Sequence, residues 1–341
     1  MTKALLDVRD LRVSFPVRRA GAMPWSRPQQ LRAVNGVDFT LYPGETLGVV
    51  GESGCGKSTL ARALIGLIPA TGRAEWSDGA DLIGLSPPQM MAYRSRIQMI
   101  FQDPLASLNP RMTVGQIIAE PLTTHAPRMP RAQVKDRVKA MMDRVGLLPG
   151  QINRYPHEFS GGQCQRIGIA RALIVEPQLI ICDEPVSALD VSIQAQVINL
   201  LMQLQADLGL SLIFIAHDLS VVRHISDRVM VLYLGKVMEI ASSDDLYACP
   251  QHPYTQALLS AVPVPDPTHD PETTVVPLRG DLPSPLNPPS GCVFRTRCPR
   301  AQERCAVEVP DLAGTNHQTA CHFPGTLTAE EIAQARRTEA A

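Results

Sequence analysis

The chain of 341 residues is long enough for one large domain with an extension or for two domains. Its net charge of −1 offers no strong field for nucleic acid, and aromatic residues at 4 % are too scarce for a base-stacking platform, so no nucleic-acid partner is expected. We expect no signal peptide, because the first residues alternate polar and apolar side chains like a strand. No apolar run approaches the roughly 18 residues of a membrane span, so membrane contact is expected only through a partner.

The N-terminal part of the chain predicts strands and a helix on either side of a glycine-rich loop. Alternating side chains predict strands at 5–15 and 31–41, with a loop containing Pro, Gly and Arg at 17–30 between them. The apolar run 45–50 suits a buried parallel strand, and residues 60–67 have the apolar spacing of a helix.

Residues 51–59, between that strand and that helix, read G-x-x-x-x-G-K-[ST], the P-loop pattern. Its glycines let backbone N–H groups turn toward phosphate oxygens, and the helix N-terminus adds the positive end of its dipole. Lys57 can reach the β- and γ-phosphates of a nucleoside triphosphate, and Ser58 can offer its hydroxyl to Mg²⁺. The expected nucleotide-binding residues of this loop are Gly51, Glu52, Ser53, Gly54, Cys55, Gly56, Lys57, Ser58 and Thr59.

Beyond this loop, strands alternate with helices. A turn at 76–79 and a core strand at 96–101 precede two amphipathic helices, 113–121 and 131–145, which predict a helical insertion. Further along, the sequence predicts helices from about 160 to 175 and at 191–208, and strands at 178–182, 212–216 and 228–233. The alternation favours an α/β fold with a parallel sheet covered by helices. Because no tandem repeat is present, we expect one nucleotide-binding domain per chain.

Two carboxylates follow the apolar strand at 178–182. The carboxyl ends of parallel strands open onto the ligand crevice of such a sheet, so Asp183 and Glu184 are expected to face the nucleotide. Asp183 can hold Mg²⁺ directly or through water, and Glu184 can polarise the water that attacks the γ-phosphate. The alternative, two solvated loop acids, is disfavoured by the P-loop upstream.

A second anion-binding loop lies at 159–163 and reads Phe-Ser-Gly-Gly-Gln. Two glycines before a helix start suit a phosphate, and Ser160 can cap that helix. A chain that binds one nucleotide needs two such loops only if the second contacts a nucleotide held by another subunit. Ser160, Gly161, Gly162 and Gln163 are therefore expected to complete the site of a partner chain.

Together these motifs resemble the ATP-binding subunits of ABC transporters, whose signature is usually Leu-Ser-Gly-Gly-Gln. Phe159 replaces the leucine here, and Cys164 follows where a basic residue or glutamine is more common. The resemblance covers about residues 5–245. It implies a P-loop NTPase nucleotide-binding domain with a RecA-like parallel sheet, an antiparallel β subdomain and a helical subdomain at about 103–175.

The same resemblance implies roles for individual residues. Gln102 matches the Q-loop, which links Mg²⁺ to the transmembrane subunits, and Asp190 matches the D-loop across the dimer. His217 matches the switch histidine near the γ-phosphate. Phe15 lies where the family places an aromatic that stacks on adenine, with a plain core position as the alternative. The expected catalytic residues are Lys57, Glu184 and His217, and the expected Mg²⁺ ligands are Ser58, Gln102 and Asp183.

Three segments resemble one class within this family, the oligopeptide/dipeptide importer ATPases. They are 100–110, 182–196 and 252–259, and they look most like the second of the two paired ATPase subunits. The class implies ATP hydrolysis that powers import of di- or oligopeptides, with a homologous ATPase subunit as heterodimer partner, two permeases and a substrate-binding protein. It also implies a peripheral position on the cytoplasmic face of the inner membrane. Nickel chelates and glutathione stay open as substrates, because this subunit need not touch the substrate.

From Pro250 onward the chain is rich in proline, which prevents long helices. We therefore expect an ATP-binding domain at 1–248 and a separate, irregular extension at 249–341. The chain has eight cysteines, of which the scattered ones, Cys55, Cys164, Cys182 and Cys249, imply a reducing cytosol.

The other four cysteines, Cys292, Cys298, Cys305 and Cys321, cluster within the extension. Clustered cysteines in a cytosolic protein more often bind metal than form disulfides, and four thiolates suit tetrahedral zinc or an iron–sulfur cluster. The segment resembles the C-terminal domain of the importer class, for which a [4Fe–4S] cluster is the expected occupant. Zinc and no metal stay as alternatives.

Three other kinds of protein share parts of this pattern. A DNA-repair ATPase of the same superfamily would separate its P-loop from its signature by a long coiled coil, and a translation factor would carry two ATP-binding cassettes; the sequence shows neither. A redox protein would use the cysteine cluster for electron transfer, so its activity would change with potential, whereas a structural cluster would change only stability.

Overall fold

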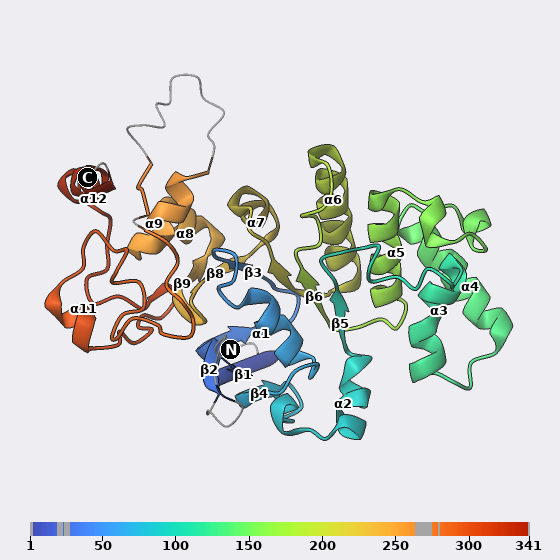
Figure 1. The fold of residues 1–341 in the computed structure, drawn as a ribbon. Helices are drawn as coiled ribbons and strands as arrows, with labels where there is room; N and C mark the ends of the chain where they lie inside the picture. Colours follow the sequence, from blue (N-terminus) through green and yellow to red (C-terminus); the bar gives the residue numbers. More distant parts are fainter. Residues whose placement is uncertain (1–2, 19–22, 24–27, 263–274, 279, 340–341) are drawn as a thin grey trace.

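The structure is a computed structural model that describes residues 3–18, 23, 28–262, 275–278 and 280–339 (Figure 1). Most of the loop expected at 17–30 and part of the proline-rich stretch lie outside these residues. No described helix combines the length and the apolar character that crossing a membrane requires.

The centre of the described chain is a sheet of seven strands in the order β10-β9-β8-β3-β7-β6-β5 (Figure 1). The pairs from β8 to β5 are parallel, as predicted, whereas β9 and β10 are antiparallel additions at one edge that the sequence did not predict. The strands are β3 (Thr46–Val50), β5 (Ile97–Ile100), β6 (Leu179–Asp183), β7 (Ser211–Ile215), β8 (Arg228–Tyr233), β9 (Lys236–Ser242) and β10 (Gln318–Thr319).

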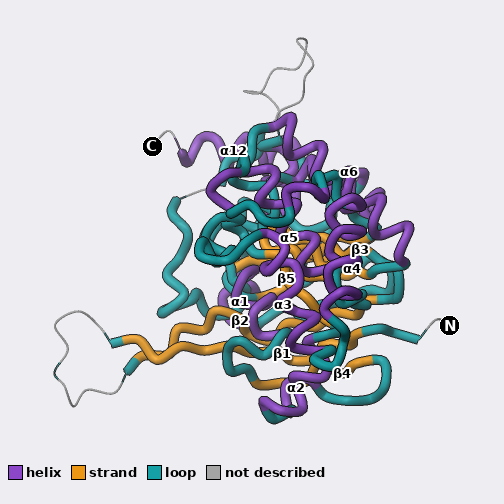
Figure 2. Tube along the Cα trace, turned by 90° about the vertical axis from the view of Figure 1, so that its right-hand side faces the viewer, coloured by secondary structure: helices purple, strands orange, loops and turns teal. Residues whose placement is uncertain are grey.

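A second, antiparallel sheet has the strand order β2-β1-β4 among the described residues, in agreement with the expected β subdomain. It consists of β1 (Leu6–Val17), β2 (Gln29–Leu41) and β4 (Thr71–Trp76). The first two strands run two residues further toward their connecting loop than predicted, because the cross-strand ladder continues to the pair Val17–Gln29. Figure 2 shows these two strands extending together from the body of the molecule.

Helices cover the central sheet and form the insertion expected from the sequence. The helices are α1 (Lys57–Leu64), α2 (Pro87–Arg94), α3 (Val114–His125), α4 (Arg131–Arg144), α5 (Gly161–Leu173), α6 (Val191–Leu208), α7 (Leu219–Ile225), α8 (Ser243–Ala248), α9 (Pro253–Ser260), α11 (Glu303–Val307) and α12 (Ala329–Glu339). Three short 3₁₀ turns are η1 (Leu82–Gly84), η2 (Pro149–Gln151) and η3 (Pro156–Glu158). In Figure 1, α3, α4 and α5 lie together at the end of the molecule beyond β5.

Helix α3 differs from its prediction, which ended it at Pro121. The helix continues through this proline to His125, although proline removes one backbone hydrogen bond. Ile117, Ile118 and Leu122 are buried with Pro121 on one face. Burial of this apolar face offsets the missing hydrogen bond. The prediction ended the helix at the proline because it did not take this burial into account.

Alternate residues of the parallel strands serve two hydrophobic cores. On β7, Leu212 and Phe214 pack with the helices of the insertion, whereas Ile213 and Ile215 pack with α1 and the antiparallel sheet. Both faces of the strand are buried, which explains why it reads as a continuous apolar run rather than an alternating one. The P-loop helix is thereby fixed between the two sheets.

The described residues of the extension include several that pack into the main core. Phe294 is fully buried among the rings of Tyr233 and Tyr254, with centroids 5.3 Å from both. Thr319 of β10 pairs with Glu239 of β9 and so joins the central sheet.

Glu239 fixes this attachment from inside the protein. Its fully buried carboxylate accepts hydrogen bonds from the backbone N–H groups of Gln251 (2.6 Å) and His252 (3.0 Å). The ring of His317 lies 2.6 Å from the same carboxylate. One buried acid therefore ties the start of α9 and the segment before β10 to the edge of the sheet.

Candidate nucleotide-binding site

The P-loop connects β3 to α1 in a turn that requires glycine. Gly51 and Gly56 have φ angles of 149° and 109°, in the region that side chains disfavour. A Cβ atom on Gly56 would lie 2.2 Å from the carbonyl oxygen of Ala33, and one on Gly51 would lie 2.1 Å from that of Leu232. The loop therefore packs tightly against two backbone segments and leaves its N–H groups for an anion.

Lys57 folds over this loop. Its buried Nζ donates hydrogen bonds to the carbonyl oxygens of Gly51 (2.7 Å) and Glu52 (3.1 Å), and lies 3.9 Å from the Cys55 sulfur. These contacts hold the ammonium group at the mouth of the loop, where it can neutralise phosphate charge.

Asp183 and Ser58 form a pair suited to a magnesium ion. The Ser58 hydroxyl donates to Oδ1 of Asp183 at 2.7 Å. Oδ2 is buried and has no hydrogen-bond partner among the described residues. Burial raises the pKa of Asp183, and the hydrogen bond from Ser58 opposes that rise. A divalent cation would satisfy the unpartnered oxygen and favour the ionised carboxylate, so these residues fit Mg²⁺.

Glu184 lies between two other predicted residues. Its Oε2 accepts a hydrogen bond of 2.9 Å from the Gln102 amide and lies 3.6 Å from Nδ1 of His217. The three residues follow β5, β6 and β7 respectively, so the parallel register brings their chain segments to one edge of the sheet. The geometry is that of a carboxylate held ready to orient a water molecule.

Several of these groups line a cavity of about 390 Å³, a size typical of small-molecule sites. The predicted residues Gly51, Glu52, Cys55, Asp183 and His217 do not line it. Predicted residues that line it are Phe15, Ser53, Gly54, Gly56, Lys57, Ser58, Thr59, Gln102 and Glu184. Leu31, Arg32, Ala33, Leu234, Gly235 and Pro285 also line it and were not predicted. No sequence motif marks these unpredicted residues. They belong to β2, to the turn after β8 and to the extension, and only the tertiary structure brings these segments to the cavity.

The second phosphate loop lies elsewhere. Ser160 caps α5, accepting a hydrogen bond from the Gln163 N–H at 3.4 Å and donating its own N–H to the Gln163 amide oxygen at 3.0 Å. The P-loop cavity is lined by neither this loop nor Asp190. In Figure 1, α5 lies among the insertion helices, apart from α1. Cys164 is buried below the loop, its thiol 3.4 Å from the Pro156 carbonyl, so it does not alter the open face.

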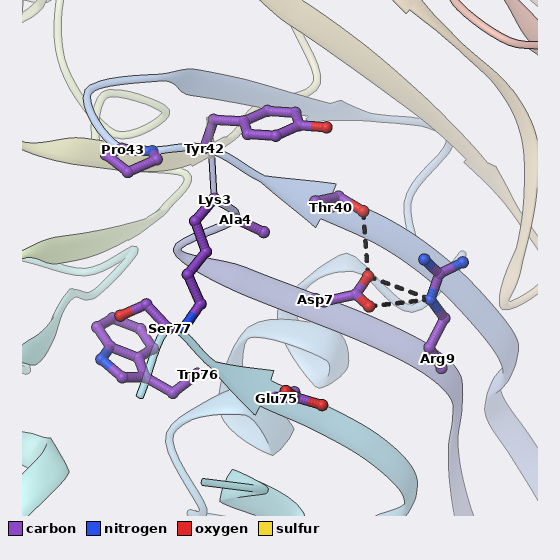
Figure 3. A pocket seen from close by; sticks show the side chains of 10 residues that line it. All are labelled: Lys3, Ala4, Asp7, Arg9, Thr40, Tyr42, Pro43, Glu75, Trp76 and Ser77. Carbon is purple, nitrogen blue, oxygen red and sulfur yellow. Dashed lines mark hydrogen bonds and ion pairs between the residues drawn. The ribbon is translucent and has the colours of Figure 1, made fainter. Parts of the chain in front are cut away.

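A second, more open hollow of about 810 Å³ lies against the antiparallel sheet (Figure 3). Asp7 there accepts hydrogen bonds from Thr40 (3.1 Å) and Arg9 (3.2 Å). None of the predicted site residues lines this hollow. We assign no function to this hollow.

The four clustered cysteines are free thiols inside the extension. Burial raises the pKa of Cys298 to about 12 and that of Cys321 to about 11, and the charges of the neighbouring cysteines add to both shifts. Among the described residues, no three His, Cys, Asp or Glu side chains are placed to share one metal ion. The structure therefore does not bear out a site for a single ion at these cysteines.

The fold and the P-loop site define the class of protein: a P-loop ATPase of the ATP-binding-cassette type. The sequence pattern of the ABC transporter family matches residues 34–187, and that of the oligopeptide/dipeptide transporter C-terminal region matches residues 238–305. Two solved structures share the fold, each with a TM-score of 0.61. One is cbiO1 from Clostridium perfringens, part of the ABC transporter complex cbiONQ (26 % identity, covering 72 % of this chain and 91 % of that one). The other is the dimeric ATP-binding cassette MJ0796 bound to ADP and Pi (25 % identity, covering 70 % and 98 %).

Curated relatives define the family more narrowly. The oligopeptide transport ATP-binding protein OppF of Escherichia coli (strain K12) is 64 % identical over 321 residues, which cover 94 % of this chain and 96 % of that protein. OppF of Haemophilus influenzae is 62 % identical, covering 93 % of this chain and 96 % of that protein. The chain belongs to the ABC transporter family of oligopeptide transport ATP-binding proteins.

Proposed function

We propose that this chain is the ATP-hydrolysing subunit that powers import of di- and oligopeptides through an ABC transporter. The observation that carries the proposal is the position of Glu184, held between Gln102 and His217 at the P-loop cavity. The family relationship over nearly the whole chain supplies the transport role and the peptide substrate class.

In this proposal, the P-loop N–H groups and Lys57 bind the phosphates and stabilise charge on the γ-phosphate. Ser58, Asp183 and Gln102 would hold Mg²⁺, which would neutralise charge on the phosphate oxygens. Glu184 accepts a proton from the attacking water, and His217 orients that water with it. Phe15, which lines the same cavity, stacks on the adenine.

Each ATP site is proposed to be completed by a second subunit. Ser160, Gly161, Gly162, Gln163 and Asp190 are all outside the cavity of their own chain, which supports a role opposite a partner's nucleotide. The helix N-terminus of α5 presents N–H groups suited to a γ-phosphate. We propose a heterodimer with a homologous ATPase subunit, in which this chain is the second of the pair.

The permeases are proposed to bind where the helical insertion meets the core sheet, on the cytoplasmic face of the membrane. A groove of about 330 Å³ there is lined by Phe101 at the end of β5, by Met91 of α2 and by Pro121 of α3. Met91 and the neighbouring Leu67 are large apolar side chains exposed to solvent. Phe101 precedes Gln102, so a permease helix seated in this groove would act next to the catalytic carboxylate. The substrate-binding protein then joins through the permeases.

The proposed domain boundaries are 1–248 for the ATP-binding domain, with a helical subdomain at about 103–175, and 249–341 for the extension. We propose that Cys292, Cys298, Cys305 and Cys321 hold a [4Fe–4S] cluster. All four are free thiols, and they lie within one stretch of the extension. Four thiolates are the ligand set that such a cluster requires.

Cys298→Ala is expected to remove the metal and lower the melting temperature of the extension, because a proline-rich segment relies on such a group for stability. Visible absorption and metal content of anaerobically purified protein provide the test, with the exposed Cys249→Ala as the matched control. Brown wild-type protein with about four irons per chain supports the proposal. Colourless protein with one zinc replaces it by the zinc alternative, and unchanged metal and melting in Cys298→Ala refute the ligand role.

The transport role is tested by peptide uptake into proteoliposomes that contain the assembled importer. We expect ATP-dependent accumulation of a labelled oligopeptide that stops when Glu184→Gln replaces the wild-type chain. Uptake of a nickel chelate or glutathione in place of the peptide would overturn the substrate class while leaving the ATPase assignment in place.

A further inference from the structure

The second residue of the P-loop, Glu52, is fastened to the C-terminal extension. Its carboxylate receives both arms of the Arg297 guanidinium, with Nη1 to Oε2 at 2.6 Å and Nη2 to Oε1 at 3.0 Å. Its backbone N–H donates to the hydroxyl of Tyr254 at 2.9 Å. These contacts connect residues more than two hundred positions apart in the chain, which no sequence pattern indicates.

Glu52 is also joined to the catalytic lysine. Its carbonyl oxygen accepts a hydrogen bond from Nζ of Lys57. All three polar groups of this one residue are therefore engaged: the carboxylate by Arg297, the N–H by Tyr254 and the carbonyl by Lys57. Glu52 does not line the nucleotide cavity, whereas Ser53, Gly54 and the residues from Gly56 to Thr59 do. Arg297 and Tyr254 thus hold the start of the loop and leave its phosphate-binding half free.

Arg297 is held firmly on its own side. Its side chain is 7 % exposed, and its guanidinium lies 5.9 Å from the centre of the Tyr233 ring. Its backbone N–H donates to the Phe294 carbonyl at 3.0 Å, and the next residue in the chain is Cys298. The two-armed contact needs the planar fork of arginine, which lysine does not have. Loss of Glu52 would leave the Arg297 charge with little access to water.

The extension also reaches the nucleotide cavity itself through Pro285, which lines it together with Lys57 and Phe15. The loop of the extension that carries the cysteines and the wall of the cavity therefore belong to one packed unit.

We propose that Arg297 is a positioning residue of the ATP site: through Glu52 it sets the P-loop backbone and the direction of the Lys57 ammonium. The extension is then part of the nucleotide-binding machinery, and its integrity is required for full ATP affinity. This inference rests on the proposed ATPase function and adds a residue outside the ATP-binding domain to that site.

The test compares ATP affinity of the purified full chain, by calorimetric titration with a non-hydrolysable ATP analogue, across variants at Arg297 and Glu52. Arg297→Met and Glu52→Gln are each expected to weaken binding about tenfold, which corresponds to about 1.4 kcal/mol. Arg297→Lys keeps the charge without the fork and is expected to fall in between. The double variant is expected to bind no more weakly than either single variant, because both changes remove the same contact.

Arg300→Met is the matched control. Arg300 belongs to the same loop and makes a similar two-armed pair with Glu331, at 2.6 and 2.8 Å, which does not involve the P-loop. We expect this variant to lower the melting temperature as Arg297→Met does, while ATP affinity stays within about twofold of wild type. In the assembled ATPase, Arg297→Met is expected to raise KM for ATP more than it lowers kcat, because the carboxylate of Glu184 is held by Gln102 and His217.

Three results would overturn the inference: equal loss of ATP affinity in Arg300→Met and Arg297→Met, wild-type affinity in Arg297→Met and Glu52→Gln, or additive losses in the double variant. Failure of the proposed function looks different, because the wild-type chain would then not bind the ATP analogue at all.

Discussion

Replacement of Glu184 by Gln is expected to leave ATP binding intact and to lower the rate of hydrolysis by roughly a thousandfold, within the range attributed to a general base. Glutamine has the size of glutamate and can keep the contact with the Gln102 amide after its own amide is turned. It cannot accept a proton from water, so the loss falls on turnover. Binding depends on the P-loop and Lys57, which the change does not touch.

The measurement pairs nucleotide binding with steady-state ATPase activity of the assembled importer. Glu176→Gln is a suitable control, because Glu176 is an exposed acid whose ion pair, with Arg137, is a loose one of 3.8 Å. Normal hydrolysis in Glu184→Gln would assign the base to another residue. Loss of binding in that variant would place Glu184 in nucleotide recognition instead.

The backbone at Glu184 supports a functional role for this side chain. Its φ angle of 47° lies in the left-handed region, which costs a residue with a Cβ about 1 kcal/mol or more. Its N–H donates to the Ile215 carbonyl at 3.0 Å, which fixes this turn against β7. This unfavourable conformation occurs directly after β6, where it turns the Glu184 carboxylate toward Gln102 and His217.

Replacement of Phe294 by Ala is expected to destabilise the docked extension by about 3–5 kcal/mol, the usual cost of removing a buried aromatic ring. The ring is fully buried and packs against Tyr233 of β8, Tyr254 of α9 and His252, with centroid separations of 5.3, 5.3 and 5.6 Å. The cavity left behind cannot close easily, because these partners are held by the central sheet and by Glu239.

Denaturant unfolding, together with hydrogen exchange across residues 292–323, measures this effect. Phe294→Leu keeps most of the apolar volume and is expected to cost less, and Val307→Ala, at a side chain that is 81 % exposed, is expected to cost almost nothing. If Phe294→Ala changed stability no more than Val307→Ala does, the extension would not share the main core as the contacts indicate.

Local sequence patterns were sufficient for much of the fold. The strands β3, β5, β6, β7 and β8 were predicted to within about two residues, because strands buried on both faces appear as unbroken apolar runs. The bounds of α6 were predicted without error, since its apolar spacing ends at a glycine with positive φ. The P-loop was evident because only glycine fits its turns.

The chemical groups of the site were also present in the sequence as candidates, and the parallel register explains why they meet. Gln102, Glu184 and His217 follow neighbouring parallel strands, so any fold with that strand order brings their segments together at one edge. Helix α3 was cut short in the prediction, because the effect of Pro121 was judged locally and its buried face was not known.

By itself, the sequence determined that this protein has a P-loop, paired carboxylates, a Ser-Gly-Gly turn at the start of a helix and a parallel sheet, because each is a pattern of neighbouring residues. Only the tertiary structure decided that the extension enters the central sheet through β10 and that Arg297 holds Glu52. It also placed Pro285 at the nucleotide cavity. Such contacts join residues that are far apart in the chain. The packing of the whole core decides which partner a buried charge or an edge strand has, and the local spacing of apolar residues does not.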